Sequence, residues 1–128
     1  MQKKSVKNRP KNLNLFTIRL PINAVVSILH RLSGVALFLM LPFILLAFQR
    51  SVKSQATYTA LAELLNTWFV KLMLIGLAWA FFHHFFAGIR HLLQDAHWMT
   101  TLQKARFSGR VVLWLVGFAV AAFAFVVW

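Results

Sequence analysis

One histidine, His84, lies in the middle of a long apolar segment, and a polar group made of Ser27, His30 and Arg31 interrupts another. An ionisable side chain inside a membrane span is costly and usually has a functional role. Imidazole is an axial ligand of haem iron, and hydroxyl and guanidinium groups donate hydrogen bonds to carbonyl oxygens. The sequence therefore predicts a cofactor or substrate held between membrane helices.

Helical periodicity gathers these residues on two faces. On the first segment the spacing i, i+3, i+4, i+7 places Ser27, His30, Arg31 and Gly34 on one side. On the second segment one side carries Gly76, Ala80, His84, Gly88 and His91. Small residues beside a histidine leave a flat slot that fits a porphyrin edge, with His84 as the iron ligand. The same pattern is typical of ordinary packing between membrane helices, so both interpretations stay open.

A membrane arginine such as Arg31 needs an anionic or carbonyl partner. The chain has only two carboxylates, Glu63 and Asp95. Asp95, a haem propionate or a quinone carbonyl would each serve as the partner. Together with the Ser27 hydroxyl, Arg31 predicts a quinone head-group site, which combines apolar walls with a few placed polar groups.

The composition is that of an integral membrane protein. Of its 128 residues 60% are hydrophobic and 12% are charged, which is about half the usual charged share. The lack of cysteine excludes disulfides, iron–sulfur ligation and thiol catalysis within this chain. The net charge of +12 lies at the ends of apolar segments, which favours membrane topology and anionic lipid headgroups over nucleic acid.

The elements that must position these residues are transmembrane helices, so the predicted fold is all-α. A basic arm, 1–21, precedes a three-helix transmembrane domain, 22–128, with spans of about 22–48, 64–92 and 111–128. Gly109 is expected to end the loop before the third span. These elements leave no room for a soluble catalytic domain, so any chemistry depends on a cofactor or a partner chain.

The distribution of basic residues predicts the direction of the spans. The arm holds six Lys or Arg residues, the stretch 93–110 holds three, and the stretch 49–63 holds two. The positive-inside rule then places the N-terminus in the cytoplasm and the C-terminus in the periplasm. In that orientation His30 and His84 reach a similar depth, nearer the cytoplasmic face.

Three motifs together indicate a family. They are Arg9-Pro10-Lys11-Asn12-Leu13, the stretch from Ser27 to Gly34, and the stretch from His84 to Asp95. The chain resembles the cytochrome b556 subunits of bacterial succinate dehydrogenase over nearly its whole length. The resemblance implies an inner-membrane subunit that, with a second small hydrophobic subunit, anchors a flavoprotein and an iron–sulfur protein.

The resemblance also implies roles for single residues. His84 would be one axial ligand of haem b, and the second anchor subunit would supply the other. Ser27 and Arg31 would line the ubiquinone site together with the iron–sulfur subunit. His30, Arg31 and His91 would lie near the haem propionates, and Asp95 would close the inner end and influence the quinone region.

Four alternatives stay open at this point. The chain could be a haem-free membrane anchor, with His84 buried for packing only. It could belong to a fumarate reductase that works in the opposite direction on menaquinol, or be a small transporter subunit. Finally, haem could be ligated within this chain, by His30 and His84 together.

Overall fold

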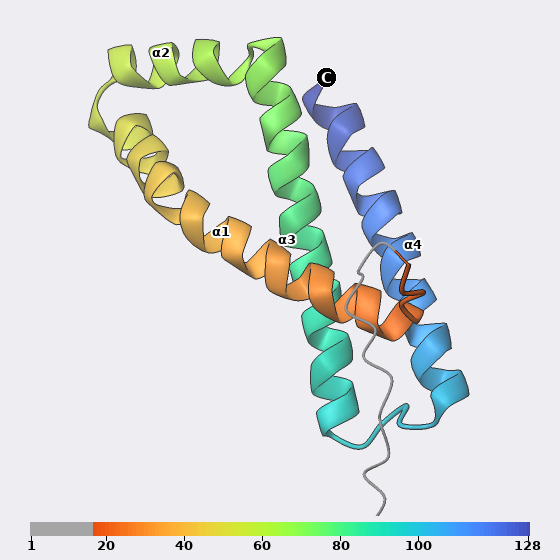
Figure 1. Cartoon of the computed structure of the whole chain (residues 1–128). Coiled ribbons are helices and arrows are strands. Elements are labelled where there is room, and N and C mark those ends of the chain that lie inside the picture. The colour runs from red at the N-terminus through yellow and green to blue at the C-terminus, as the bar shows by residue number, and fades with distance from the viewer. Residues whose placement is uncertain (1–16) are drawn as a thin grey trace, which may run out of the picture.

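The computed structural model describes residues 17–128, and the regular elements in this range are all helices (Figure 1). They are α1 (Ile22–Lys53), α2 (Gln55–Leu65), α3 (Trp68–Asp95) and α4 (Leu102–Val127). Of these, α1, α3 and α4 are long and apolar enough to cross a membrane. The predicted all-α fold with three spans is therefore confirmed. The arm motif at Arg9–Leu13 lies outside the described residues, and the direction of the spans stays a prediction.

The stretch expected to link the first two spans as a loop contains a helix, α2. Ser54 has an extended backbone, with φ −164° and ψ 162°, which ends α1 and begins α2. Its hydroxyl accepts a hydrogen bond from the Thr57 backbone N–H, and the Thr57 hydroxyl accepts one from the Ser54 N–H. This reciprocal cap stabilises the first turn of α2. The helix runs from the end of α1 to the start of α3 (Figure 1).

The third spanning helix begins earlier than predicted, at Leu102 instead of Val111. Thr101 caps it, because the Thr101 hydroxyl accepts a hydrogen bond from the Lys104 backbone N–H. The expectation that Gly109 ends a loop is wrong, since Gly109 is buried inside α4. Lys104, Arg106 and Arg110 end the uncharged apolar stretch, but a helix can continue through charged residues, so α4 extends beyond that stretch.

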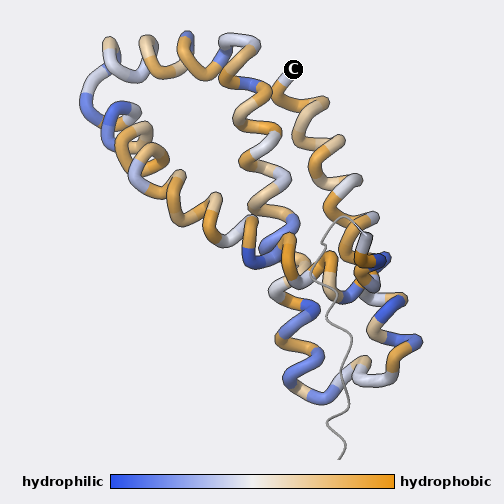
Figure 2. Tube along the Cα trace, in the orientation of Figure 1, coloured by the Kyte–Doolittle hydropathy of each residue, from blue (hydrophilic) through white to orange (hydrophobic). Residues whose placement is uncertain are grey.

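The helix α3 is central and packs against α1, α2 and α4. A small buried cluster joins α1, α3 and α4 through Val26, Ala87, Val112 and Val116. Most other apolar side chains on the spans are exposed, as expected of helices that face lipid or partner subunits. Figure 2 shows that hydrophobic residues predominate along the spans and that more hydrophilic residues lie near their ends.

The two ends of the bundle differ in how the helices are connected there. The loop end is where α1 begins, α3 ends at Asp95 and α4 begins at Leu102. The α2 end is the opposite one, where α1 and α3 have separated and α2 bridges the gap between them (Figure 1). His30 and His84 lie where α1 crosses α3, so their predicted similar depth is confirmed by the contact between them.

Candidate functional site

His84 is held in one orientation by α1. Its Nδ1 lies 3.1 Å from the backbone oxygen of His30. A carbonyl oxygen can only accept, so Nδ1 carries the proton and donates it, and Nε2 keeps its lone pair. A histidine that binds a metal typically donates its other ring N–H in this way, which fixes both tautomer and ring orientation. This leaves Nε2 as the ring nitrogen with a free lone pair, and the iron-ligand role of His84 stays a prediction.

Glycine on α1 makes room for this ring. A Cβ atom at Gly34 would lie 2.9 Å from Cε1 of His84, closer than real Cβ contacts allow. The close approach of His84 to α1 therefore requires glycine at this position. The predicted slot lay among small residues of the second span, so Gly34 on α1 is an additional small neighbour of His84.

His30 and His91 complete a cluster of three histidine rings from two helices. The rings of His30 and His84 are stacked, with centroids 4.2 Å apart and planes 7° apart. The edge of His91 meets His30 with centroids 5.1 Å apart. Gly88 faces this cluster, because a Cβ there would lie 3.4 Å from Nε2 of His30.

The small residues on the His84 side of α3, which are Gly76, Ala80 and Gly88, have different surroundings. Gly88 faces the histidine cluster, whereas Ala80 is buried and Gly76 has open space beside it. Ala80 therefore belongs to a packing surface, whereas the porphyrin slot stays a prediction. The space beside Gly34 is taken up by the His84 ring, and Gly88 lies against the His30 ring.

The stacked rings argue against haem ligation by His30 and His84 together. Two axial imidazoles must lie on opposite sides of the porphyrin plane and aim their nitrogens at the iron between them. Here the two ring faces are in contact, which leaves no space for a porphyrin between them. Within residues 17–128 no group of three or more His, Cys, Asp or Glu side chains is arranged to hold a metal ion.

Arg31 and Ser27 lie next to the histidine cluster on an open groove. Nη2 of Arg31 donates to Oγ of Ser27 over 3.4 Å, and the Arg31 side chain is exposed. The groove has a volume of about 480 Å³ and is lined by His30, Arg31, Gly34, Val35, Phe38 and His84. Arg31 therefore presents a positive charge to the same space as His84.

Asp95 does not pair with Arg31. It is the last residue of α3 and is exposed at the loop end, one turn beyond His91. No ion pair joins these two described side chains, so the Arg31–Asp95 contact that the sequence allowed is absent. Arg31 remains available to a ligand.

His83, to which the sequence gave no role, is completely buried. It faces the protein interior, away from His84, as the helical angle between neighbouring residues predicts. Its Nε2 lies 3.3 Å from the Val26 backbone oxygen, and its ring stacks on Trp79. Its Nδ1 is buried without a hydrogen-bond partner in the part of the chain that the structure describes. His83 thus links α3 to α1 in the core.

Arg90 is also buried, although the sequence suggested only a charge at the edge of a loop. Its side chain is 5% exposed. Nε donates to Oγ of Ser108 over 3.0 Å, and Nη2 donates to Oδ1 of Asn23 over 3.0 Å and to the Ala105 backbone oxygen over 3.2 Å. The spacing of His83, Ala87 and Arg90, which share one helical face, is the sequence signal that could have indicated this burial.

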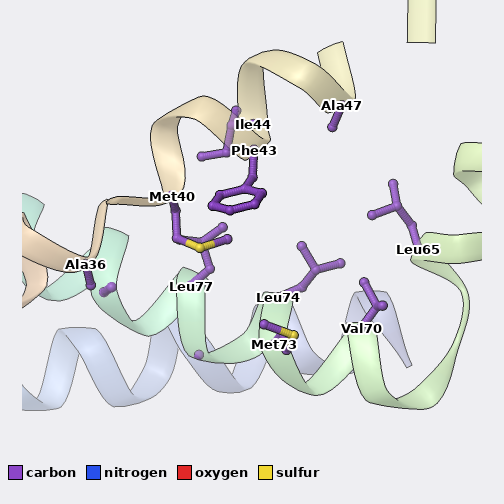
Figure 3. A pocket seen from close by; sticks show the side chains of 12 residues that line it. Ala36, Met40, Phe43, Ile44, Ala47, Leu65, Val70, Met73, Leu74 and Leu77 are labelled. Carbon is purple, nitrogen blue, oxygen red and sulfur yellow. The ribbon is translucent and has the colours of Figure 1, made fainter. Parts of the chain in front are cut away.

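A separate apolar pocket of about 340 Å³ lies toward the α2 end (Figure 3). Figure 3 shows side chains from α1, α2 and α3 around it, among them Met40, Leu65 and Leu77. None of the lining residues carries a charged group or a side-chain N–H or O–H. The pocket therefore has no hydrogen-bond donor that would orient a quinone carbonyl.

Comparison with known proteins gives a consistent result. A family described as the succinate dehydrogenase/fumarate reductase transmembrane subunit matches residues 5–124, which include all the candidate residues. The succinate dehydrogenase cytochrome b556 subunit of Coxiella burnetii (strain RSA 493 / Nine Mile phase I) is 37% identical over 106 residues, covering 81% of this chain and 84% of that protein.

Two further relatives are also cytochrome b subunits of succinate dehydrogenase. The succinate dehydrogenase cytochrome b556 subunit of Paracoccus denitrificans is 30% identical over 106 residues, covering 83% of this chain and 82% of that protein. The succinate dehydrogenase cytochrome b560 subunit of Reclinomonas americana is 32% identical over 115 residues, covering 84% and 78% respectively. The chain therefore belongs to the succinate dehydrogenase/fumarate reductase transmembrane subunit family.

Proposed function

We propose that this chain is the haem b-binding membrane anchor of a succinate dehydrogenase and forms part of its ubiquinone-reduction site. The observation that carries the proposal is the arrangement of His84. Its Nδ1 is engaged by the His30 carbonyl, its Nε2 is left for iron, and it shares a groove with Arg31. The names of the relatives, which are cytochrome b subunits of succinate dehydrogenase, support haem b as the cofactor.

The residues of this chain fit one side of a haem. His84 would supply one nitrogen ligand to the iron, and the His30 carbonyl holds that imidazole in place. His30, Arg31 and His91 lie beside it, where they would donate to or balance the charge of the propionates. When bound, the haem supplies a one-electron redox centre. The second axial ligand would come from a second hydrophobic anchor subunit, because the stacked His30 ring is unsuited to that position.

Ser27 and Arg31 would bind the quinone head group. Ubiquinone takes up two electrons and two protons to become ubiquinol, and negative charge develops on its oxygens as electrons arrive. A guanidinium close to one oxygen stabilises that charge, and the Ser27 hydroxyl gives a second donor one turn away. Asp95, exposed at the loop end, would influence this region from the surface.

The electrons must come from other chains. This chain has no cysteine, so it cannot hold the iron–sulfur clusters that would carry electrons to the membrane. We therefore infer an iron–sulfur subunit next to Ser27 and Arg31, and a flavoprotein subunit that oxidises succinate. In a bacterial inner membrane the positive-inside rule would place these subunits on the cytoplasmic side, at the loop end.

The first test is a reduced-minus-oxidised visible spectrum of the native complex purified in detergent, with its co-purifying chains identified. A b-type α-band together with a flavoprotein and an iron–sulfur protein is the expected result. A quinone-reducing complex with those partners and no haem band would instead indicate a haem-free anchor. Net fumarate reduction by menaquinol in the same preparation would assign the complex to the opposite direction.

Gly34 offers a local test of the haem site. We expect Gly34→Ala to displace the His84 ring, because the added Cβ would lie 2.9 Å from Cε1. Overpacking of this kind costs about 1–3 kcal/mol, enough to lower haem affinity about tenfold. Haem per assembled complex is measured by pyridine haemochrome absorbance.

The matched control for Gly34 is Gly117→Ala in α4. Nothing lies within 4 Å of a Cβ at Gly117, and both substitutions gain the same helix propensity. Equal haem content in the two variants would argue against the packing of His84 on Gly34.

A further inference from the structure

Arg90 is a buried cation without a carboxylate. The chain has two acidic residues. Glu63 lies in α2 at the other end of the bundle, and Asp95 is exposed at the loop end. The guanidinium is instead surrounded by neutral acceptors, the Asn23 amide, the Ser108 hydroxyl and the Ala105 carbonyl. Burying a charge in this way has a high desolvation cost, so a role that depends on its geometry is expected.

The geometry joins all three spanning helices at one point. Arg90 is on α3, Asn23 is in the first turn of α1, and Ser108 and Ala105 are in α4. The two helices are in close contact here, since a Cβ at Gly109 would lie 3.4 Å from Oδ1 of Asn23. The planar fork of arginine carries donors on separate nitrogens, so Nε reaches α4 while Nη2 reaches α1 and α4, whereas the three donors of lysine share one nitrogen.

Within α1 itself, the cap and the first turn supply few other polar contacts that would hold the start of the helix. Pro21 occupies the N-cap position without a side-chain hydrogen bond, and the first turn contains no acidic residue. In lipid, apolar contact gives little preference for one helix rotation over another, so polar contacts and close packing set the position of a helix. Asn23 is the side chain through which this first turn is held.

The functional face of α1 begins one turn after that contact. Ser27 follows Asn23 by four residues, and Arg31 follows by eight, so both continue along the same side of the helix. A helix is stiff over two turns, so a rotation at Asn23 is transmitted to Ser27 and Arg31. The position of these two side chains relative to His84 on α3 therefore depends on the Arg90 contacts.

We propose that Arg90 is a positioning residue that fixes the rotation and depth of the quinone-facing side of α1. It faces the interior with His83 and Ala87 and lies on a different side of α3 from His84 and His91. It therefore acts through Asn23, Ser27 and Arg31, without touching quinone or haem. The contact itself is independent of the proposed function, whereas its effect on quinone binding rests on that function.

The contact is tested by hydrogen–deuterium exchange on the intact purified complex. In Arg90→Gln, amides of residues 25–31 should exchange about tenfold faster, the change expected from losing a charge-assisted hydrogen bond. The control is Arg106→Gln, an exposed arginine near the start of α4, which should leave these amides unchanged. Unchanged exchange in Arg90→Gln would overturn the proposal, whatever the catalytic activity of the complex.

The effect on the site is tested with a pair of substitutions at Asn23, which also serves if Arg90 variants fail to assemble. Asn23→Asp keeps the acceptor and adds a carboxylate, so it should leave the quinone KM within about twofold of the parent. Asn23→Leu removes the acceptor at similar volume and should raise the quinone KM about tenfold, with less change in kcat.

Succinate oxidation by an artificial acceptor serves as the assembly control and should not change in either Asn23 variant. Equal quinone KM values in Asn23→Asp and Asn23→Leu, or parallel losses in both assays, would show that the contact has only a structural role. A parent complex that does not reduce quinone at all would contradict the proposed function instead, and the exchange measurement would still decide whether Arg90 holds α1.

Discussion

His84→Ala is expected to remove most of the haem from the assembled complex, to below about one tenth of the parent content. Losing even a group that supports a metal ligand lowers affinity about 10–100-fold, and this substitution removes the ligand itself. The three spans should still insert, because His84 is at the edge of a groove and contributes little to the core. The measurement is the b-type α-band per complex, with subunit content determined on the same sample.

The control for this prediction is His97→Ala. His97 is an exposed histidine in the loop between α3 and α4, where its φ of 64° places it in the left-handed region. Its removal should leave the haem spectrum unchanged. A His84→Ala complex with full haem content would refute the ligand assignment, and loss of haem in both variants would point to general instability.

Arg31→Ala is expected to lower quinone reduction about 100-fold while leaving succinate oxidation by an artificial acceptor intact. The magnitude follows from losing one preorganised donor to a developing oxyanion, which costs about 2.7–4 kcal/mol. Arg31 is exposed on the groove and contributes no buried packing, so its removal should not affect folding. Both activities are measured on the same detergent-purified complex.

Arg110→Ala is the matched control, because Arg110 is an exposed arginine on α4 at the same end of the bundle. It should preserve both activities. Parallel loss of both activities in Arg31→Ala would indicate a folding or assembly defect and would remove the support for a quinone role. The rate of quinone reduction in Ser27→Ala should lie between the rates in Arg31→Ala and Arg110→Ala, since the hydroxyl is a weaker donor than the guanidinium.

The sequence predicted the parts of this structure that depend on periodicity along one helix. Ser27, His30 and Arg31 share a face because of their spacing, and the depth of His84 follows from its distance to the end of its span. The role of each of these side chains stays a prediction. The family resemblance was confirmed by the match over residues 5–124.

Features that depend on capping or on contacts between distant segments were missed. The helix α2 is short and lies outside the long apolar segments, so a search for spans treats it as a loop. Arg90 reaches Asn23 across 67 residues and Ser108 across 18, and charge counting assigned it to a loop edge. His83 was left without a role because one sequence does not show that the Val26 carbonyl lies opposite it.

The unequal distribution of polar contacts along α1 has a mechanical consequence. Contacts from α3 reach α1 at Asn23, at the Val26 carbonyl and at the His30 carbonyl, all within its first third. Beyond the crossing, α1 separates from α3 and meets apolar side chains around the pocket of Figure 3. This distal arm can therefore tilt to match bilayers of different thickness, while the held segment keeps the site geometry constant.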